Sequence, residues 1–238
     1  AAIVTLSDDM AQTLHARGLG PLPIQLINNP PLTAESAPVA PPANLAKPEG
    51  TVRVIFAGNL GQFQNLPLLA EGVALCFDDH PELELMFLGD GVALPDLEAR
   101  WGDHPQVRFA PFLPFSQARG IIAGADIGLV SLNPGIYRVA YPSKISTYRD
   151  LGLRILALVE PHSQIARALE AEGRGAVPHN STVAAIAAAL ETLLANGRAP
   201  HVAEFERTSD LKQTTWPALV AGLATGATAV EMAKTIAD

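Results

Sequence analysis

The sequence predicts an α/β protein built on a doubly wound parallel sheet. Short apolar runs of strand length alternate with helical patterns from Thr51 to Leu194. Glycine-containing turns follow several of these runs. Regular alternation of strand and helix implies right-handed crossovers between parallel strands, so we expect helices on both faces of the sheet.

The apolar runs give the strands in order. They cover residues 2–6, 52–57, 83–88, 107–109, 127–132, 153–159 and 175–177. Apolar residues at helical spacing predict helices at 66–77, 94–101, 116–123, 163–172 and 181–194, and another that starts near residue 143. A short helix from Met10 is expected to end at Gly18 or Gly20, with Ser7 as its N-cap and acidic residues in its first turn.

A proline-rich segment separates the first elements from the rest. Residues 21–50 hold eight of the 20 prolines and few charges. Only residues 24–27 have the pattern of a strand. Such a composition is typical of an extended, fairly stiff linker.

Bulk composition excludes several classes of function. The chain has 238 residues, 48% of them hydrophobic, with a formal net charge of -8. An acidic protein lacks the basic face that sequence-independent nucleic-acid binding or a polybasic membrane patch requires. Cys76 stands alone in an apolar helical pattern, which predicts a core thiol in a reducing compartment. No apolar run approaches the ~18 residues of a spanning helix. The first residue is Ala1 rather than methionine, which is typical of a piece of a longer protein.

The stretch from Tyr141 to Gly152 lies between two predicted strands and reads as a crossover helix. Pro142 ends any earlier helix, and Ser143 is expected to be the N-cap. Lys144 then falls in the first helical turn, where free N–H groups and the helix dipole favour a phosphate. The alternative, equally open from the sequence, is a solvated surface lysine.

Two glycine turns are expected at the same edge of the sheet as Lys144. They are Gly58 to Gly61 and Gly89 to Gly91, each directly after a predicted strand. Either turn alone is more often a tight connection between strand and helix. Together with the helix at residue 143, they favour a nucleotide site at the carboxyl edge of the sheet.

Several other chemistries lack their motifs. The P-loop and the dinucleotide fingerprint are both absent. The six histidines are scattered without the spacing of metal ligands, so no metal site is predicted. No serine lies in a nucleophile elbow, and Cys76 has no evident base. The paired acids, Asp8-Asp9 and Asp78-Asp79, lie in turns and at helix ends, where capping is their usual role.

The order of these motifs resembles glycosyltransferase family 4, near the bacterial branch that makes polysaccharides and carries a Pro-Ser-Lys motif. The resemblance runs from about Val52 to Leu194. The matching segments are Phe56-Ala57-Gly58-Asn59-Leu60-Gly61, Phe87-Leu88-Gly89-Asp90-Gly91, Val107-Arg108-Phe109 with Phe112-Leu113-Pro114, Ala125-Asp126-Ile127 and Pro142-Ser143-Lys144.

The resemblance implies one Rossmann-like lobe of a GT-B enzyme, with a remnant of the N-terminal lobe. Residues 1–28 would end the N-terminal lobe, and residues 29–50 would be the proline-rich linker. Residues 51–197 would form the donor-binding domain. Residues 198–238 would be helices that cross back to the N-terminal lobe, with Phe205 and Trp216 as aromatic anchors. Most of the acceptor-binding lobe would then lie outside this chain.

The resemblance also implies a retaining transfer of sugar from a UDP- or GDP-sugar, without a metal or other cofactor, to a glycan or lipid-linked acceptor. Lys144 would be the catalytic group, because it would stabilise negative charge on the leaving diphosphate. The full-length protein would be cytoplasmic or peripheral at the inner membrane. Its oligomeric state is left open, with a homo-oligomer as one alternative. The donor-binding residues implied are Gly58, Asn59, Leu60, Gly61, Gln62, Gly89, Asp90, Phe112, Leu113, Pro114, Tyr137, Ser143 and Thr147.

Three positions depart from the family pattern. Val139 and Thr147 stand where two glutamates are common, one near the donor sugar and one at the ribose. Gln62 stands where a basic residue often follows the glycine turn. These departures keep open a non-catalytic domain that binds a nucleotide sugar or serves in assembly. A dehydrogenase-like domain is a third hypothesis, disfavoured by the absent fingerprint.

Overall fold

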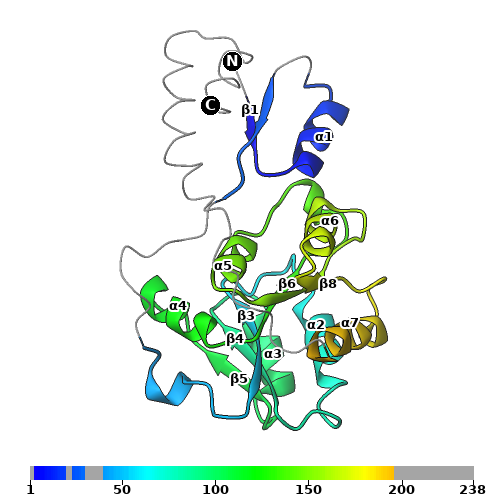
Figure 1. The fold of residues 1–238 in the computed structure, drawn as a ribbon. Coiled ribbons are helices and arrows are strands. Elements are labelled where there is room, and N and C mark those ends of the chain that lie inside the picture. The colour runs from blue at the N-terminus through cyan, green and yellow to red at the C-terminus, as the bar shows by residue number, and fades with distance from the viewer. Residues whose placement is uncertain (1–2, 20–22, 30–39, 196–238) are drawn as a thin grey trace.

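The computed structural model describes residues 3–19, 23–29 and 40–195. Its main body is a six-stranded parallel sheet in the order β5-β4-β3-β6-β7-β8 (Figure 1). This order confirms the predicted doubly wound α/β fold. The predicted helices of residues 198–238, with Phe205 and Trp216, and residues 30–39 of the predicted linker lie outside the described residues. The strands are β3 (Val52–Ala57), β4 (Leu83–Leu88), β5 (Val107–Ala110), β6 (Ile127–Ser131), β7 (Arg154–Leu158) and β8 (Gly175–Ala176).

Among the described residues, three helices cover each face of this sheet. On one face α2 (Leu66–Ala74), α3 (Leu94–Trp101) and α7 (Val183–Ala195) pack on side chains such as Val54 and Phe56. On the other face α4 (Phe115–Ala123), α5 (Lys144–Asp150) and α6 (Gln164–Ala171) pack on the alternate side chains, such as Ile55. Because successive residues of a strand point to opposite faces, a continuous apolar strand requires two covering layers.

A small second unit precedes this domain. It consists of β1 (Ile3–Thr5), α1 (Asp8–Ala16) and β2 (Ile24–Leu26), with β1 and β2 paired in parallel. The Ser7 hydroxyl accepts a hydrogen bond from the Met10 N–H at 3.2 Å, which confirms the predicted N-cap. We call these elements the N-terminal unit. Its strand β2 corresponds to the strand predicted at residues 24–27 of the proline-rich segment.

The end of the proline-rich segment is packed rather than free. Its 3-10 helix η1 (Ala43–Leu45) brings the Leu45 carbonyl to the Arg53 guanidinium at 2.8 Å. Arg53 is 1% exposed and donates to Glu84 at 2.5 Å, and Glu84 also pairs with Arg108 at 2.7 Å. Lys47 pairs with Asp126 at 2.7 Å close by. This charged cluster fixes residues 43–47 to the amino edge of the sheet, so the prediction of an extended linker up to residue 50 is wrong for these residues.

Cys76 lies directly after α2 and is buried, as predicted. Burial raises the pKa of its thiol to about 12, with a contribution from Glu191. A thiol with so high a pKa carries almost no thiolate at neutral pH, so Cys76 is a core side chain. Among the described residues, no helix is long and apolar enough to cross a membrane.

The pH dependence of stability should include a contribution from His80. Its Nε2 lies 3.0 Å from Glu191 of α7, and this hydrogen bond raises the pKa of His80 above 6.5. A raised pKa in the folded state stabilises that state below about pH 6.5, and the gain is lost as the pH rises through the raised pKa. We expect the free energy of unfolding to change by no more than about 1 kcal/mol, because the pair is partly exposed. Urea unfolding at pH 5.5 and 8.5 measures it, and His80→Gln should remove this part of the difference.

Candidate functional site

The strands β3 and β6 separate where the strand order reverses. They pair only at Val54 with Ile127 and at Ile55 with Gly128. By contrast, β3 pairs with β4 along its whole length, and so does β6 with β7. In doubly wound sheets the crevice at this reversal, outside the carboxyl ends of the strands, is the usual ligand site.

Tyr148 of α5 fills the place of the missing strand pairing. Its hydroxyl accepts a hydrogen bond from the Ala57 N–H at 3.0 Å and donates one to the Ile55 carbonyl at 3.3 Å. Burial raises the pKa of Tyr148, which keeps the hydroxyl protonated for this role. Gly128 makes room for the ring, because a Cβ there would lie 2.4 Å from the Tyr148 Cδ2.

Tyr148→Phe should lower the free energy of unfolding by about 1–3 kcal/mol, because it leaves buried backbone groups of Ala57 and Ile55 without partners. Urea unfolding monitored by circular dichroism measures the loss. Tyr141→Phe is the control: it removes a hydroxyl for which the described residues show no hydrogen bond, so its effect should stay within ~0.5 kcal/mol. Equal effects of the two substitutions would contradict the bridging role of Tyr148.

The two predicted glycine turns meet at this edge. The Gly58 N–H donates to the Leu88 carbonyl at 2.8 Å, and the Leu60 N–H donates to the Asp90 carbonyl at 2.8 Å. Gly89 has φ +145°, and a Cβ there would lie 1.9 Å from the Gly58 oxygen. The turns therefore interlock, and only glycine permits the approach. The sequence predicted this meeting of the two turns, and the structure confirms it.

Lys144 is the first residue of α5 and Ser143 holds the N-cap position, both as predicted, but the Ser143 side chain does not cap the helix. Ser143 has φ -61° and ψ -24°, which is already helical, and its side chain makes no capping hydrogen bond. The backbone instead starts the turn one residue earlier, with the Ile145 N–H donating to the Pro142 carbonyl at 3.2 Å. A capping serine needs extended backbone angles, which Ser163 shows at the start of α6.

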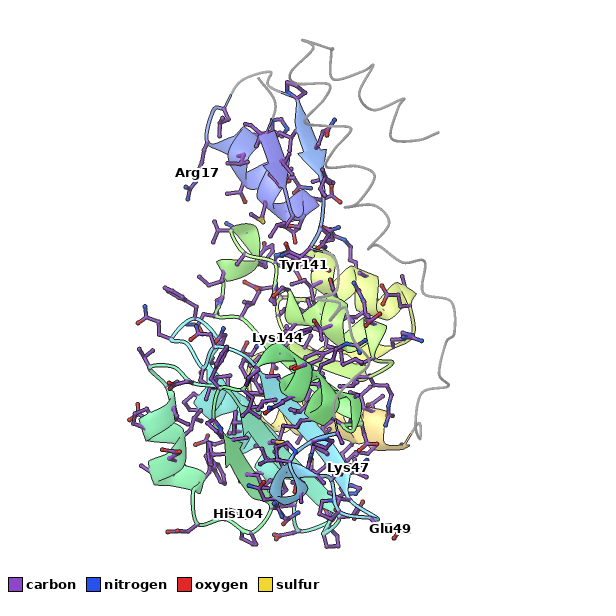
Figure 2. The ribbon with its side chains drawn as sticks, turned by 90° about the vertical axis from the view of Figure 1, so that its left-hand side faces the viewer. Arg17, Lys47, Glu49, His104, Tyr141 and Lys144 are labelled. Carbon is purple, nitrogen blue, oxygen red and sulfur yellow. The ribbon has the colours of Figure 1, made fainter. Side chains whose placement is uncertain are left out.

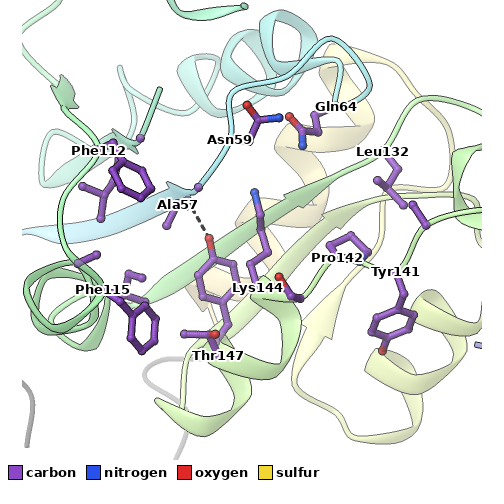
Figure 3. Close-up of a pocket in the computed structure, with 18 of the residues that line it drawn as sticks. Ala57, Asn59, Gln64, Phe112, Phe115, Leu132, Tyr141, Pro142, Lys144 and Thr147 are labelled. Atoms are coloured by element: carbon purple, nitrogen blue, oxygen red, sulfur yellow. Dashed lines mark hydrogen bonds between the residues drawn. The ribbon is translucent and has the colours of Figure 1, made fainter. Parts of the chain in front are cut away.

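The Lys144 ammonium site is buried in the crevice. Its Nζ has no hydrogen-bond partner within the described residues and lies 3.2 Å from the centre of the Phe56 ring. The same atom lies 3.9 Å from the position that a Cβ of Gly58 would take. Figure 3 shows it pointing towards Asn59 and Gln64. The alternative of a solvated surface lysine is therefore wrong.

Burial lowers the pKa of Lys144 well below its ordinary value of 10.5. The face of Phe56 attracts a cation, but such contacts contribute only about 2 kcal/mol even when desolvated. Removing the water around an ammonium costs several kcal/mol. The cost of desolvating the ammonium therefore exceeds the gain from the Phe56 ring. The described residues that line the site supply no negative charge to pair with Lys144.

A cavity of about 550 Å³ opens around Lys144. Phe112 and Phe115 lie on one side of the lysine, and Leu132 and Tyr141 on the other (Figure 3). The charged side chain that lines the cavity is Lys144; the other lining residues of the described chain are apolar or neutral polar. The cavity can thus hold an elongated ligand with an anionic centre between two less polar ends.

Comparisons with known proteins relate the chain to glycosyltransferases. No family model matches the chain. It is 25% identical over 189 residues to the probable glycosyltransferase WbjE of Pseudomonas aeruginosa, covering 76% of this chain and 47% of that protein. It matches the solved structure of the lipopolysaccharide outer core galactosyltransferase WaaB with a TM-score of 0.58 at 16% identity, covering 82% of this chain and 53% of that one.

The structure of WaaG, a glycosyltransferase involved in lipopolysaccharide biosynthesis, matches with a TM-score of 0.56 at 14% identity. That match covers 81% of this chain and 53% of WaaG. The described α/β domain has the fold of one GT-B lobe. The chain spans about half the length of the proteins it matches, so the activity of a whole enzyme is a matter for proposal.

The cavity of this GT-B lobe gathers eight of the fourteen residues that the sequence singled out. These are Lys144, Gly58, Asn59, Gly89, Phe112, Leu113, Ser143 and Thr147. The other six do not line it: Leu60, Gly61, Gln62, Asp90, Pro114 and Tyr137. Leu60 is fully buried in the apolar core, and the Asp90 carboxylate accepts a hydrogen bond from its neighbour Gly91.

Tyr137 faces away from the cavity of the GT-B lobe. It lies in the 3-10 helix η2 (Ile136–Arg138), is 6% exposed, and its hydroxyl lies 2.8 Å from the His162 Nε2. Its neighbour Ile136 lines the cavity instead. Arg149, another cation of α5, pairs with Glu172 at 2.8 Å. Of the two neighbours in this turn, the structure thus places Ile136 at the wall of the cavity and Tyr137 against His162.

Sequence reasoning missed several lining residues of the GT-B lobe, among them Gln64, Phe115 and Tyr148. Tyr148 follows Lys144 by four residues, and this spacing puts both on the same side of a helix. That signal was present in the sequence. Gln64 carried no such signal, because its Oε1 accepts from the Gly61 N–H at 2.7 Å within an irregular turn. The described residues contain no group of three side chains suited to a metal ion.

Proposed function

We propose that this chain is the donor-binding lobe of a glycosyltransferase and that its cavity binds the diphosphate of a nucleotide sugar. The observation that carries the proposal is the buried, unpartnered Nζ of Lys144 beside the Gly58 turn. A buried ammonium without a partner is costly, and a diphosphate would supply the missing charge and hydrogen-bond acceptors. The N–H groups of Gly58, Leu60 and Gly61 already donate within the protein, so this turn would contribute a close backbone approach to the ligand rather than donors.

The lining residues suggest the orientation of this ligand. Phe112 and Leu113 offer apolar surface to a base, and Thr147 offers a hydroxyl to the ribose. The diphosphate would lie at Gly58 and Lys144. The sugar would then lie towards Leu132 and Ile136 on the opposite side of the lysine.

In this proposal Lys144 acts through charge. Cleavage of the sugar–phosphate bond leaves negative charge on the nucleoside diphosphate, and a prepositioned ammonium in a water-poor crevice stabilises it. Retention of configuration, independence of metal ions, and a glycan or lipid-linked acceptor follow from the family resemblance. The reaction would need a second lobe to complete the cleft. We place the full-length protein in the cytoplasm or at the inner membrane, in polysaccharide synthesis.

A non-catalytic nucleotide-sugar-binding domain is the second candidate. Val139, at a position where the family that the sequence resembles commonly has a glutamate, is 52% exposed and offers no charge to a sugar. Thr147 lines the cavity but provides one hydroxyl where a carboxylate would form stronger, charge-assisted hydrogen bonds. Both observations favour binding over turnover.

Titration calorimetry with UDP, GDP and NAD tests the shared part of both candidates. We expect UDP or GDP to bind and NAD not to bind. Binding of NAD without either diphosphate would overturn the proposal and support a dehydrogenase-like domain. Assays of the full-length protein with a panel of nucleotide sugars then separate the two candidates, because transfer or donor hydrolysis requires a catalyst.

A further inference from the structure

The N-terminal unit meets the GT-B lobe through two helix N-termini that cap each other. The Asp9 Oδ2 of α1 accepts a hydrogen bond from the Gln164 N–H, the first residue of α6, at 2.7 Å. The Gln164 Oε1 in turn accepts from the Asp8 N–H, the first residue of α1, at 2.7 Å. Figure 1 shows α1 directly next to α6 across this contact.

The Asp9 side chain at this contact is buried and hydrogen-bonded. Asp9 is 8% exposed although it carries a carboxylate. The positive ends of two helix dipoles would repel each other at this distance, and the Asp9 carboxylate between them offsets that repulsion. Arg167 of α6 adds a longer ion pair to Asp9 at 3.7 Å.

A series of contacts connects Arg167 of this interface to the wall of the cavity. The Arg167 guanidinium donates to the His162 carbonyl, and the His162 Nε2 lies 2.8 Å from the Tyr137 hydroxyl in η2. Glu160, in the same loop, accepts from the Gly135 N–H at 2.5 Å just before η2. In addition, α1 lies against η2 itself. Ile136 of η2 lines the cavity, and its N–H donates at 3.1 Å to the carbonyl of Asn133, the neighbour of Leu132, which lies on the side away from Phe112 (Figure 3).

We propose that the paired caps of α1 and α6 fix the position of η2, so that the placement of the N-terminal unit sets the shape of one side of the cavity. Asp9 is then a positioning residue: it touches no ligand but holds the loop that does. This inference rests on the proposed function only for the identity of the ligand. The side it affects is the one proposed for the sugar, and Gly58 and Lys144 make none of the contacts described above.

Asp9→Ala tests this inference by amide hydrogen exchange without any ligand. The Val139 and Ala140 N–H groups both donate to the Ile136 carbonyl, at 2.9 and 3.0 Å, so exchange at residues 133–140 reports on η2. We expect faster exchange in residues 133–140 and 160–164 but not in α7. Unchanged exchange at 133–140 would overturn the inference.

The same variant tests the predicted difference between the two sides of the cavity. Binding of a sugar nucleotide, UDP-glucose or GDP-mannose, should weaken by about twofold to thirtyfold. Binding of UDP or GDP should change by less than about twofold. A purely structural role for Asp9 would weaken both equally, and that result would contradict the inference. If no nucleotide binds the unmodified chain, the proposed function fails while the exchange experiment still decides the role of Asp9.

Two further variants serve as controls. Asp8→Ala removes the same charge from the same helical turn, but Asp8 contributes only its backbone N–H to the contact, so exchange in η2 should not change. If Asp9→Ala unfolds the chain, exchange will rise in α7 as well. Gln164→Ala then replaces it, because it removes only the acceptor for the Asp8 N–H, and a normal η2 in that variant would overturn the inference.

Discussion

Lys144→Met should stabilise the free protein and weaken its binding of a nucleoside diphosphate. Methionine keeps the apolar stem against Phe56 and removes the buried Nζ that lacks a partner. Relief of an unsatisfied buried group should raise the free energy of unfolding by about 1–3 kcal/mol. Loss of a charge-assisted hydrogen bond to the diphosphate should weaken binding by about tenfold to a hundredfold. Urea unfolding and titration calorimetry measure the two effects.

Arg149→Ala is the matched control, because it removes a cation from the same helix. Arg149 pairs with Glu172 and does not line the cavity. Its loss should therefore leave diphosphate binding within about twofold of the unmodified chain. Equal losses of affinity in the two variants would show that net charge, and not the placement of Lys144, drives binding.

Proton uptake on binding gives a second signature of Lys144. Burial depresses its pKa in the free protein, and a bound diphosphate would raise it again. Binding should therefore take up protons, and affinity should fall as the pH rises through the free-state pKa. Calorimetry in two buffers of different ionisation enthalpy measures this uptake. In Lys144→Met the part due to the lysine should vanish, while the part due to the phosphate itself remains.

The fold and the centre of the site could be predicted from the sequence because both depend on local patterns. Alternating apolar runs and helical spacings fixed the order of strands and helices, and parallel strands put all their carboxyl ends at one edge. The meeting of Gly58 with Lys144 follows from that edge alone. Neither prediction needed knowledge of contacts between distant residues.

The outer parts of the site depend on contacts that local patterns do not contain. Tyr137 and Ile136 are neighbours in a short 3-10 helix, and the contact of Tyr137 with the distant His162 accompanies the placement of Ile136 at the cavity. Ser143 has the right residue type for an N-cap, but Pro142 already accepts a backbone hydrogen bond and starts the turn before it. A tertiary contact overrode the local preference at Tyr137, and a turn that begins one residue earlier overrode it at Ser143.

Arg53→Met should lower the free energy of unfolding by about 3–5 kcal/mol, because it leaves the buried Glu84 with one partner fewer. Arg53 is 1% exposed, and its guanidinium also donates to the Leu45 carbonyl. Urea unfolding measures the loss. Arg100→Met is the control, since the ion pair of Arg100 with Glu71 spans 3.5 Å at an exposed position, where pairs contribute about 0–1 kcal/mol.

A double substitution tests whether the cost comes from the unpaired charge. In Arg53→Met with Glu84→Leu both buried charges are gone, so the loss should be smaller than the sum of the two single losses. Additive losses would contradict this explanation. Figure 2 shows Lys47, close to this charged cluster, at the far end of the domain from Tyr141. Because the cluster lies at the amino edge of the sheet and the cavity at the carboxyl edge, folded Arg53→Met should bind a diphosphate as the unmodified chain does.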